Sequence, residues 1–497
     1  MALSDLEYLR LPKYRRAGHK LGSFLASLPR KIVAIAFAIG RFFRGVGYTV
    51  ADVFREIVTT WKNGDYKTRT SYFVMGFGNI ARGQVLRGVL FLLFEIVFIL
   101  YMALIGVANM LKLGTLGTEK TWEDDWGVTH WGDNSFRILL YGVISIFFIV
   151  GFFYTWYQNI KQNKISQEIL ATGKPLKSGK QDLQSLVDDQ FHKTLLSLPL
   201  LGILIFTVLP IFFMILIAFT NYDKSHQPPN KLFTWVGFNN FAQLFDVGSG
   251  SNFGSTFGEI LVWTLVWAFF ATFTNYFLGM VVAMLINKKG IKLKKLWRTV
   301  LVVSIAIPQF ISLLYVGKMF ARDGLVNQLL QSLGMIQDPL PFWEDKWWAR
   351  ITVVIVNIWV GIPYLMLITT GILMNIPADL YESARIDGAN AWKMYFKITL
   401  PYMLFVTGPY LLSSFIGNMN NFNVIYLLSG GAPVSSKLTG GAGYTDLLIT
   451  WLFKLTVDNS NYKLASVIGI MVFVVVAFIS VVIYNIIPSM KNEEDFQ

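Results

Sequence analysis

Long apolar stretches, separated by polar segments, dominate the pattern of the sequence. Each stretch is about twenty residues long, and a helix of that length crosses the roughly 30 Å hydrocarbon core of a bilayer. The first stretch contains one acidic residue, Glu95, and the others carry no formal charge. The pattern predicts an all-α polytopic membrane protein with eight transmembrane helices, over residues 88–111, 138–157, 195–219, 260–286, 299–316, 351–374, about 400–416, and 464–487.

The charges between these stretches alternate in sign along the chain. Lys and Arg outnumber acids before the first stretch and again in segment 161–193, whereas the segment 112–137 is rich in Asp and Glu. All charged residues of the short segment 288–298 are basic. Because excess Lys and Arg gather in cytoplasmic loops, the alternation predicts an even number of spans and two cytoplasmic termini.

Composition supports a membrane protein and excludes several other classes. Of 497 residues, 54% are hydrophobic and 15% are charged, against about 25% charged residues in soluble proteins. The net charge of +13 follows the predicted topology rather than one folded basic face, so we expect no nucleic-acid partner. The absence of Cys excludes disulfides and thiolate metal sites. The four His residues have no ligand spacing, so we expect no metal site.

The chain divides into five predicted regions. Segment 31–58 has an apolar run too short to span and polar residues at helical spacing, which predicts an interfacial amphipathic helix. A signal peptide is the rival interpretation, but no small-residue cleavage site follows. The regions are a cytoplasmic N-terminal region with that helix (1–83), two accessory transmembrane helices (84–158), a cytoplasmic linker (159–194), a six-helix core with a cytoplasmic loop at 375–401 (195–490), and a cytoplasmic tail (491–497).

The predicted cytoplasmic loop within the core carries the most informative motif. Pro377 suits the first turn of a helix, and Glu382 lies near the positive end of that helix. Gly388 follows an Asp in a turn signal, and a second short helix is expected to run toward Pro401. The pattern predicts two short amphipathic helices, parallel to the membrane and joined by a glycine turn, which together suit docking in the groove of a partner.

This loop resembles the signature of the permease subunits of ABC importers, which is Glu-Ala-Ala, three residues, Gly, nine residues, Ile, one residue, Leu-Pro. Ser replaces the first Ala here. An ordinary cytoplasmic helical hairpin is the alternative interpretation. The resemblance implies that the loop inserts into a cleft of an ATPase subunit, with Glu382 and Gly388 as key residues. The coupling positions are Glu382, Ser383, Ala384, Asp387, Gly388, Ile398, Leu400 and Pro401.

A permease of this type needs partners. Phosphate-cradling loops require Gly, four residues and Gly-Lys-Ser/Thr, but the nearest string, 173–181, has one intervening residue too many and ends in Gln. We therefore expect no cofactor in this chain and no enzymatic activity of its own. The resemblance implies a homodimeric ATPase that binds ATP and Mg, a second homologous permease, an extracellular sugar-binding protein, and a lipid bilayer at the bacterial cell membrane.

Two further stretches, 356–364 and 413–448, resemble the maltose-type permease subunit of this family. In that family the sugar lies midway through the membrane between these helices. The resemblance therefore implies a maltose or maltodextrin substrate, with another oligosaccharide, such as a galacto-oligosaccharide, as the alternative. The positions that match the sugar contacts are Asn357, Val360, Gly361, Tyr364, Ser414, Gly417, Asn418 and Asn421.

The residue types at these positions suit a neutral sugar. Uncharged amides offer both donors and acceptors to hydroxyl groups, and aromatic rings stack on the apolar faces of sugars. Asn357, Gly361 and Tyr364 share one helical face, and Asn418 and Asn421, three residues apart, can face one cavity. The alternative is that the amides hydrogen-bond between helices, as intramembrane amides often do.

Two departures from the maltose-type pattern concern the sugar and its delivery. Ile305 and Gln309 stand where the best-known family members have Tyr and Ser. These positions lie in one wall of the expected site, so they bear on the length or linkage of the sugar. The loop 220–259 is too short for the folded domain of the enteric version, which suggests a binding protein that engages without it, as in Gram-positive relatives.

Two rival functions would need acidic residues in particular places. An ion-coupled secondary transporter needs acids near the membrane midplane, and the spans after the first have none. A membrane-embedded glycan-processing enzyme needs paired carboxylates, for which the outer loops show no recognisable motif. For Glu95 we expect pairing with a neighbour or snorkelling, and for Trp122, Trp126 and Trp131 we expect an interfacial aromatic belt.

Overall fold

The computed structural model describes residues 47–245, 252–288 and 290–486, together with 37, 40, 41, 44 and 45. The predicted tail 491–497 and most of the first half of the predicted interfacial helix lie outside these residues, whereas 47–63 are helical. The chain forms two compact units, one of residues 1–216 with 225–235 and one of residues 217–224 with 236–497.

Seven helices in the described ranges are long and apolar enough to cross a membrane. They coincide with seven of the eight predicted spans, because a long uncharged run specifies a membrane helix without help from the rest of the sequence. The prediction of an all-α polytopic membrane protein is confirmed. The spanning helices cover Val85–Lys112, Ser135–Ala171, Phe191–Ile217, Phe253–Asn287, Lys346–Leu373, Ala391–Met419 and Tyr462–Tyr484.

The fifth predicted span, 299–316, is not one continuous helix. It consists of α13 (Lys294–Ala306) and α14 (Gln309–Met319), with Ile307 and Pro308 extended between them. Proline has no backbone N–H to continue the helical hydrogen bonds, and it also pushes the preceding residue out of the helical region. The break therefore follows from Pro308.

The first unit contains two of the spanning helices and most of a third. The α5 helix continues through one π-helical turn (η1) into α6, and α7 extends well past the predicted end of its span. The elements are α3 (Tyr66–Thr70), α4 (Phe77–Ile80), α5 (Val85–Tyr101), η1 (Met102–Gly106), α6 (Val107–Lys112), β1 (Trp122–Glu123), β2 (Thr129–His130), α7 (Ser135–Ala171), α8 (Gly179–Val187), α9 (Phe191–Ile203), η2 (Leu204–Val208) and, except for its last residue, α10 (Leu209–Ile217).

Two features of the first unit bear on the sequence predictions. Glu95 pairs with a neighbour, as expected: its Oε2 atom accepts a hydrogen bond of 2.8 Å from the backbone N–H of the buried Met75. The strands β1 and β2 pair antiparallel, and the Trp122 ring stacks on His130 at 4.3 Å. The side chain of Trp126, between the strands, is 90% exposed. The aromatic belt stays a prediction.

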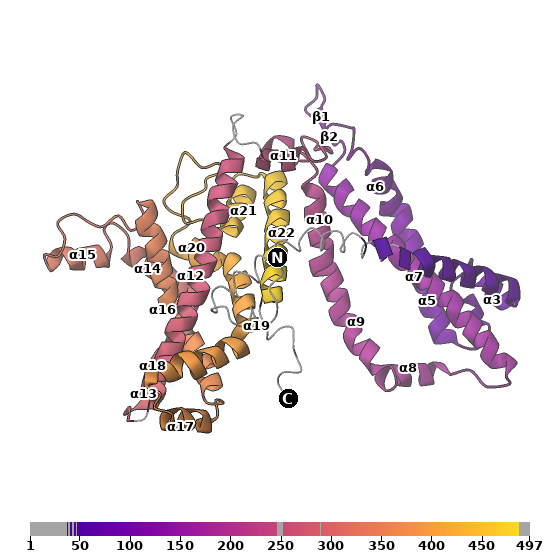
Figure 1. Ribbon diagram of the computed structural model, residues 1–497. Helices are drawn as coiled ribbons and strands as arrows, with labels where there is room; N and C mark the ends of the chain where they lie inside the picture. Colours follow the sequence, from indigo (N-terminus) through magenta and orange to yellow (C-terminus); the bar gives the residue numbers. More distant parts are fainter. Residues whose placement is uncertain are drawn as a thin grey trace, which may run out of the picture. The chain divides into compact units, whose positions relative to one another are not determined.

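The second unit packs around the long helix α12, which contacts α16, α19 and α21. The two helices α12 and α16 pack closely: a Cβ atom added to Gly279 of α12 would lie 2.8 Å from Cβ of Leu365 in α16. Figure 1 shows α11 and α17 at opposite ends of α12. The elements are α11 (Asn239–Phe245), α12 (Phe253–Asn287), α13, α14, α15 (Leu325–Ser332), α16 (Lys346–Leu373), α17 (Ala378–Ile386), α18 (Ala391–Met394), η4 (Tyr395–Thr399), α19 (Leu400–Met419), α20 (Phe422–Leu428), α21 (Leu448–Val457) and α22 (Tyr462–Ile486).

A buried ion pair holds the loop between α20 and α21. Asp446 is fully buried, and its Oδ2 atom lies 2.7 Å from Nζ of Lys454. The same carboxylate accepts hydrogen bonds from the backbone N–H of Gly443 (2.7 Å) and from the hydroxyl of Thr450 (2.9 Å). These contacts fix the loop against the first turns of α21.

Candidate functional site

The loop that carries the importer signature forms a helix, a glycine turn and a second helix. The first helix, α17, follows Pro377, and Gly388 has a φ of +73° with open space around its Cα. The side chain of Asn390 accepts a hydrogen bond from the backbone N–H of Lys393 and so caps α18. This part of the prediction is confirmed, and the positive φ explains why glycine suits the turn.

The second predicted helix of this loop is not a separate element. The α18 helix continues through the π-helical turn η4 into α19, so that one helix covers Ala391–Met419. Pro401 cannot donate a hydrogen bond to the preceding turn. The wider turn just before Pro401 keeps the helix unbroken.

The surface of this helix–turn–helix is open. The side chain of Ile386 is 87% exposed and that of Trp392 is 72% exposed, while the hydroxyls of Tyr381 and Thr399 hydrogen-bond at 2.9 Å and tie the two helices together. Figure 1 shows α17 at the same end of the second unit as the start of α13, whose first residues are basic. That arrangement agrees with the prediction that both segments lie on the same side of the membrane. Docking to an ATPase stays a prediction.

Two of the predicted sugar contacts line a pocket of about 330 Å³ at the break between α13 and α14. These two are Val360 and Tyr364 of α16, and Ile305 and Gln309 line the same pocket. The two positions that depart from the maltose-type pattern therefore lie at the same pocket as two of the predicted sugar contacts. The pocket is lined by Ile305, Ala306, Ile307, Pro308, Gln309, Ser312, Trp359, Val360 and Tyr364.

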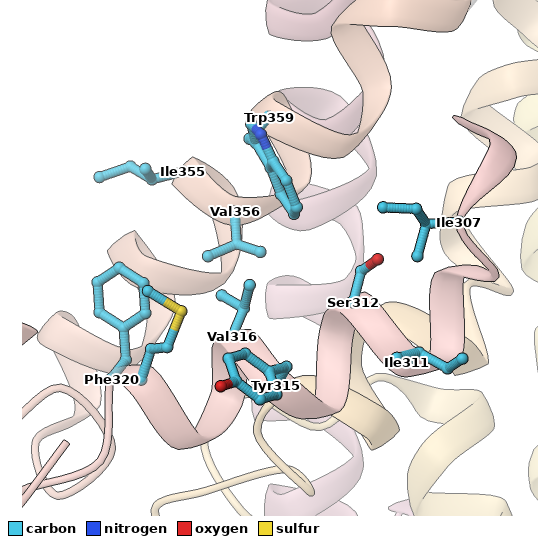
Figure 2. Close-up of a pocket in the computed structure, with 10 residues that line it drawn as sticks. Ile307, Ile311, Ser312, Tyr315, Val316, Phe320, Ile355, Val356 and Trp359 are labelled. Carbon is cyan, nitrogen blue, oxygen red and sulfur yellow. The ribbon is translucent and has the colours of Figure 1, made fainter. Parts of the chain in front are cut away.

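A second, apolar pocket of about 510 Å³ adjoins the first and shares Ile307, Ser312 and Trp359 with it. Figure 2 shows Val316 of α14 and Val356 of α16 facing each other in this pocket, with the Trp359 ring beside them. The Trp359 side chain is half exposed. It lines both the partly polar first pocket and the apolar second pocket.

The amides predicted on α19 and at the start of α20 hydrogen-bond within the protein. Nδ2 of Asn418 donates to Oγ1 of Thr272 in α12 at 3.0 Å, and the Asn418 backbone carbonyl accepts from Nε1 of Trp267 at 3.1 Å. Nδ2 of Asn421 donates to Oδ1 of Asn418 at 3.3 Å, and its Oδ1 caps α20. Both side chains stay half-exposed. In this structure, therefore, both amides make hydrogen bonds within the protein, as the alternative interpretation of the sequence expected.

The remaining predicted contacts lie on α16 and α19. Ser414 and Tyr364 both lie near the hydroxyl of Tyr410 in α19. Gly417 is exposed. Asn357 is buried, and Nδ2 of its amide has no hydrogen-bond partner among the described residues. The structure adds α12 to the site, because Trp267 and Thr272 position Asn418. The sequence gives no sign of this, since both residues lie in an unbroken apolar run.

Among the described residues, no group of three or more His, Cys, Asp and Glu side chains could hold a metal ion. The polar lining instead offers hydroxyls, amides and the main-chain groups at the helix break. This is the chemistry of uncharged, hydrogen-bonding ligands.

Comparison with known proteins places this arrangement in a family. Residues 275–491, which include the end of α12, the helix–turn–helix and all predicted sugar contacts, match the family "Binding-protein-dependent transport system inner membrane component". The galactooligosaccharides transport system permease protein GanP of Bacillus subtilis is 36% identical over 430 residues, which are 84% of this chain and 97% of GanP. The chain belongs to this family of binding-protein-dependent inner membrane components.

Other members of the binding-protein-dependent family are similar over different lengths. The maltodextrin transport system permease protein MalC of Streptococcus pneumoniae is 33% identical over 432 residues, covering 85% of this chain and 95% of MalC. The maltose/maltodextrin transport system permease protein MalF of Escherichia coli is 36% identical over 210 residues, which cover 41% of this chain and 40% of MalF. These relatives are transport permeases, which confirms the resemblance drawn from the sequence, and the chain is a membrane transport component rather than an enzyme in itself.

Proposed function

We propose that the chain is the transmembrane permease subunit of a binding-protein-dependent ABC importer that carries maltodextrins into the cytoplasm. The observation that carries the proposal is the pairing of two features in one compact unit. One is a pocket lined by Val360, Tyr364 and Gln309, and the other is an exposed helix–turn–helix with the importer signature. A neutral sugar fits the uncharged polar lining.

The mechanism follows from the continuity of the helices. An extracellular binding protein delivers the sugar, and a second permease subunit completes the cavity around the α13–α14 break. A homodimeric ATPase binds ATP and Mg and moves the segment 378–401. Because α18 continues through η4 into α19 without a break, movement of the turn at Gly388 is transmitted to the helix that carries Ser414 and Asn418. Such movement is a rigid-body switch between two access states.

The test is ATP hydrolysis by the chain reconstituted in lipid with its neighbouring permease, ATPase and binding protein, with and without maltotriose. We expect strong stimulation that needs both sugar and binding protein and is lost in Gly388→Asp. Gly290→Asp is the matched control, because Gly290 also has a positive φ (+95°) and open space around it. Hydrolysis that no sugar stimulates in the intact complex contradicts the proposal, and equal loss in both variants contradicts the coupling role of Gly388.

Two observations favour a galacto-oligosaccharide as the alternative substrate. GanP aligns over 97% of its length at 36% identity, and Ile305 and Gln309 replace the residues of the maltose-type wall in the pocket. Stimulation of the same complex by a galacto-oligosaccharide, but not by maltotriose, selects this substrate and leaves the importer class unchanged.

A further inference from the structure

A pair of buried amides lies at the contact between α12 and α16. Asn275 of α12 is 6% exposed and Asn357 of α16 is 5% exposed. Oδ1 of Asn275 and Nδ2 of Asn357 are both inaccessible to solvent, and neither has a hydrogen-bond partner among the described residues. One atom is an acceptor and the other a donor, so the interface holds two complementary and unused polar groups.

Gly361 fixes where the Asn275 amide lies. A Cβ atom added to Gly361 would stand 2.6 Å from Cγ of Asn275 and still closer to Nδ2, so only glycine admits the amide in this position. Gly361 is one helical turn after Asn357, on the same face of α16. The Asn275 side chain therefore lies against the face that carries Asn357, Gly361 and Tyr364.

The same face of α12 also reaches the other predicted sugar contacts. Thr272, one turn before Asn275, accepts the hydrogen bond from Asn418 of α19. Asn275 itself lies against Gly361 of α16, and it is one helical turn from the residue that binds Asn418 of α19. Asn275 is not one of the positions that the resemblance matched to sugar contacts.

Unpaired buried polar atoms destabilise a fold, and most buried polar groups in native proteins have partners. A leucine at position 275 would fill similar space without leaving an acceptor unused. An amide at this position, with a glycine opposite to accommodate it, is therefore better explained by a ligand than by packing.

We propose that Asn275 is a specificity-determining residue that binds one hydroxyl group of the translocated sugar together with Asn357. When the contact between α12 and α16 opens during transport, the hydroxyl donates a hydrogen bond to Oδ1 of Asn275 and accepts a hydrogen bond from Nδ2 of Asn357. This inference rests on the proposed function, since it requires an oligosaccharide substrate.

The test compares wild type with Asn275→Leu in the complete reconstituted importer, using uptake of maltotriose and of its monodeoxy derivatives. For wild type we expect one deoxy position whose loss lowers kcat/KM by on the order of tenfold, as for one lost hydrogen bond. In Asn275→Leu, maltotriose uptake should fall by a similar factor, and that deoxy position should no longer matter. The binding protein is the same in both complexes, so its own preference for maltotriose over a deoxy derivative cancels when wild type and Asn275→Leu are compared.

Thermal stability of the solubilised complex separates this role from a structural one. Asn275→Leu should leave stability unchanged or raised, whereas loss of stability in parallel with uptake overturns the proposal. Gly361→Ala should impair uptake by displacing the amide, and Gly361→Ala combined with Asn275→Ala should be no worse than Asn275→Ala alone. Asn420→Leu is the control, because Asn420 is exposed and hydrogen-bonds the carbonyl of Ile416 in its own helix.

Two further outcomes distinguish this inference from the function on which it rests. If wild type imports no maltotriose and no other oligosaccharide, the proposed function fails and the inference fails with it. If wild type imports maltotriose but every deoxy derivative shows the same ratio in both complexes, only the role of Asn275 is overturned.

Discussion

Breaking the ion pair between Asp446 and Lys454 provides a quantitative test of what holds the loop before α21. In Lys454→Met the carboxylate would keep its hydrogen bonds from Gly443 and Thr450 but lose its counter-charge. Removing one partner of a buried pair costs about 3–5 kcal/mol. We expect about 3 kcal/mol, at the lower end, because two hydrogen bonds to the carboxylate remain.

The cost in Lys454→Met should depend on pH in a definite direction. Burial raises the pKa of Asp446 above its usual value, and Lys454 opposes that rise. Without the lysine the pKa of this carboxyl rises further, so the folded state holds a proton that the unfolded state releases. Such a group contributes stability below the ordinary Asp pKa and loses it as pH rises through the folded pKa. The variant should therefore be closest to wild type near pH 5 and least stable near pH 8.

The assay is the thermal unfolding of the detergent-solubilised protein at several pH values. A loss of about 3 kcal/mol corresponds to roughly 6–12 °C in Tm, at about 2–4 °C for each kcal/mol in a unit of this size. Asp446→Asn combined with Lys454→Met removes both charges and should recover most of the loss. A Tm loss that does not vary with pH, or a double variant as unstable as the single one, would refute the reasoning.

Three further predictions concern other contacts. Glu95→Leu leaves the buried N–H of Met75 without its acceptor and should cost about 1–3 kcal/mol in thermal stability, whereas Glu95→Gln, which keeps a carbonyl oxygen, should cost less. Hydrogen bonds from the backbone N–H of Val128 and from the ring of His130 lower the pKa of Asp124. Hydrogen exchange of the β1–β2 amides, corrected for intrinsic rates, should therefore speed up as pH falls below the usual Asp pKa, and Asp124→Asn should abolish this dependence. Gly279→Ala should separate α12 from α16 and lower stability by about 1–3 kcal/mol, while Gly371→Ala, with open space around it, should have little effect on the same melting curve.

The spans followed from the sequence because hydrophobic length is a local property, but breaks within spans did not. Pro308, Pro363 and Pro409 all lie in apolar runs, yet α16 and α19 continue through theirs and only Pro308 separates two helices. The α16 helix packs extensively on α12, so neighbouring contacts hold it together around its proline. A kink and a break share one sequence signal, and packing between distant segments decides between them.

The helix–turn–helix was predictable because all its signals lie within one short segment. The role proposed for Asn275 was not, because a single Asn in a long apolar helix has no periodic partner. Its significance depends on Gly361, which is distant in sequence and lies on another helix. Similarly, the amide of Asn418 matched a sugar contact by resemblance, but only the structure shows that it bonds to Thr272 of α12. Resemblance identifies positions, whereas packing determines which hydrogen bonds they have left to offer.

The interruption at Ile307 and Pro308 also affects how selectivity can evolve. Where α13 ends and α14 begins, main-chain groups lack helical partners, and this stretch of backbone lines the 330 Å³ pocket. No side-chain substitution removes those groups, so part of the polar lining of the pocket persists whichever residue is mutated. Ile305 and Gln309, on either side of the interruption, remain free to vary. Under the proposed function, the imported sugar can therefore change one substitution at a time, while the lining keeps main-chain groups that hydrogen-bond to hydroxyls.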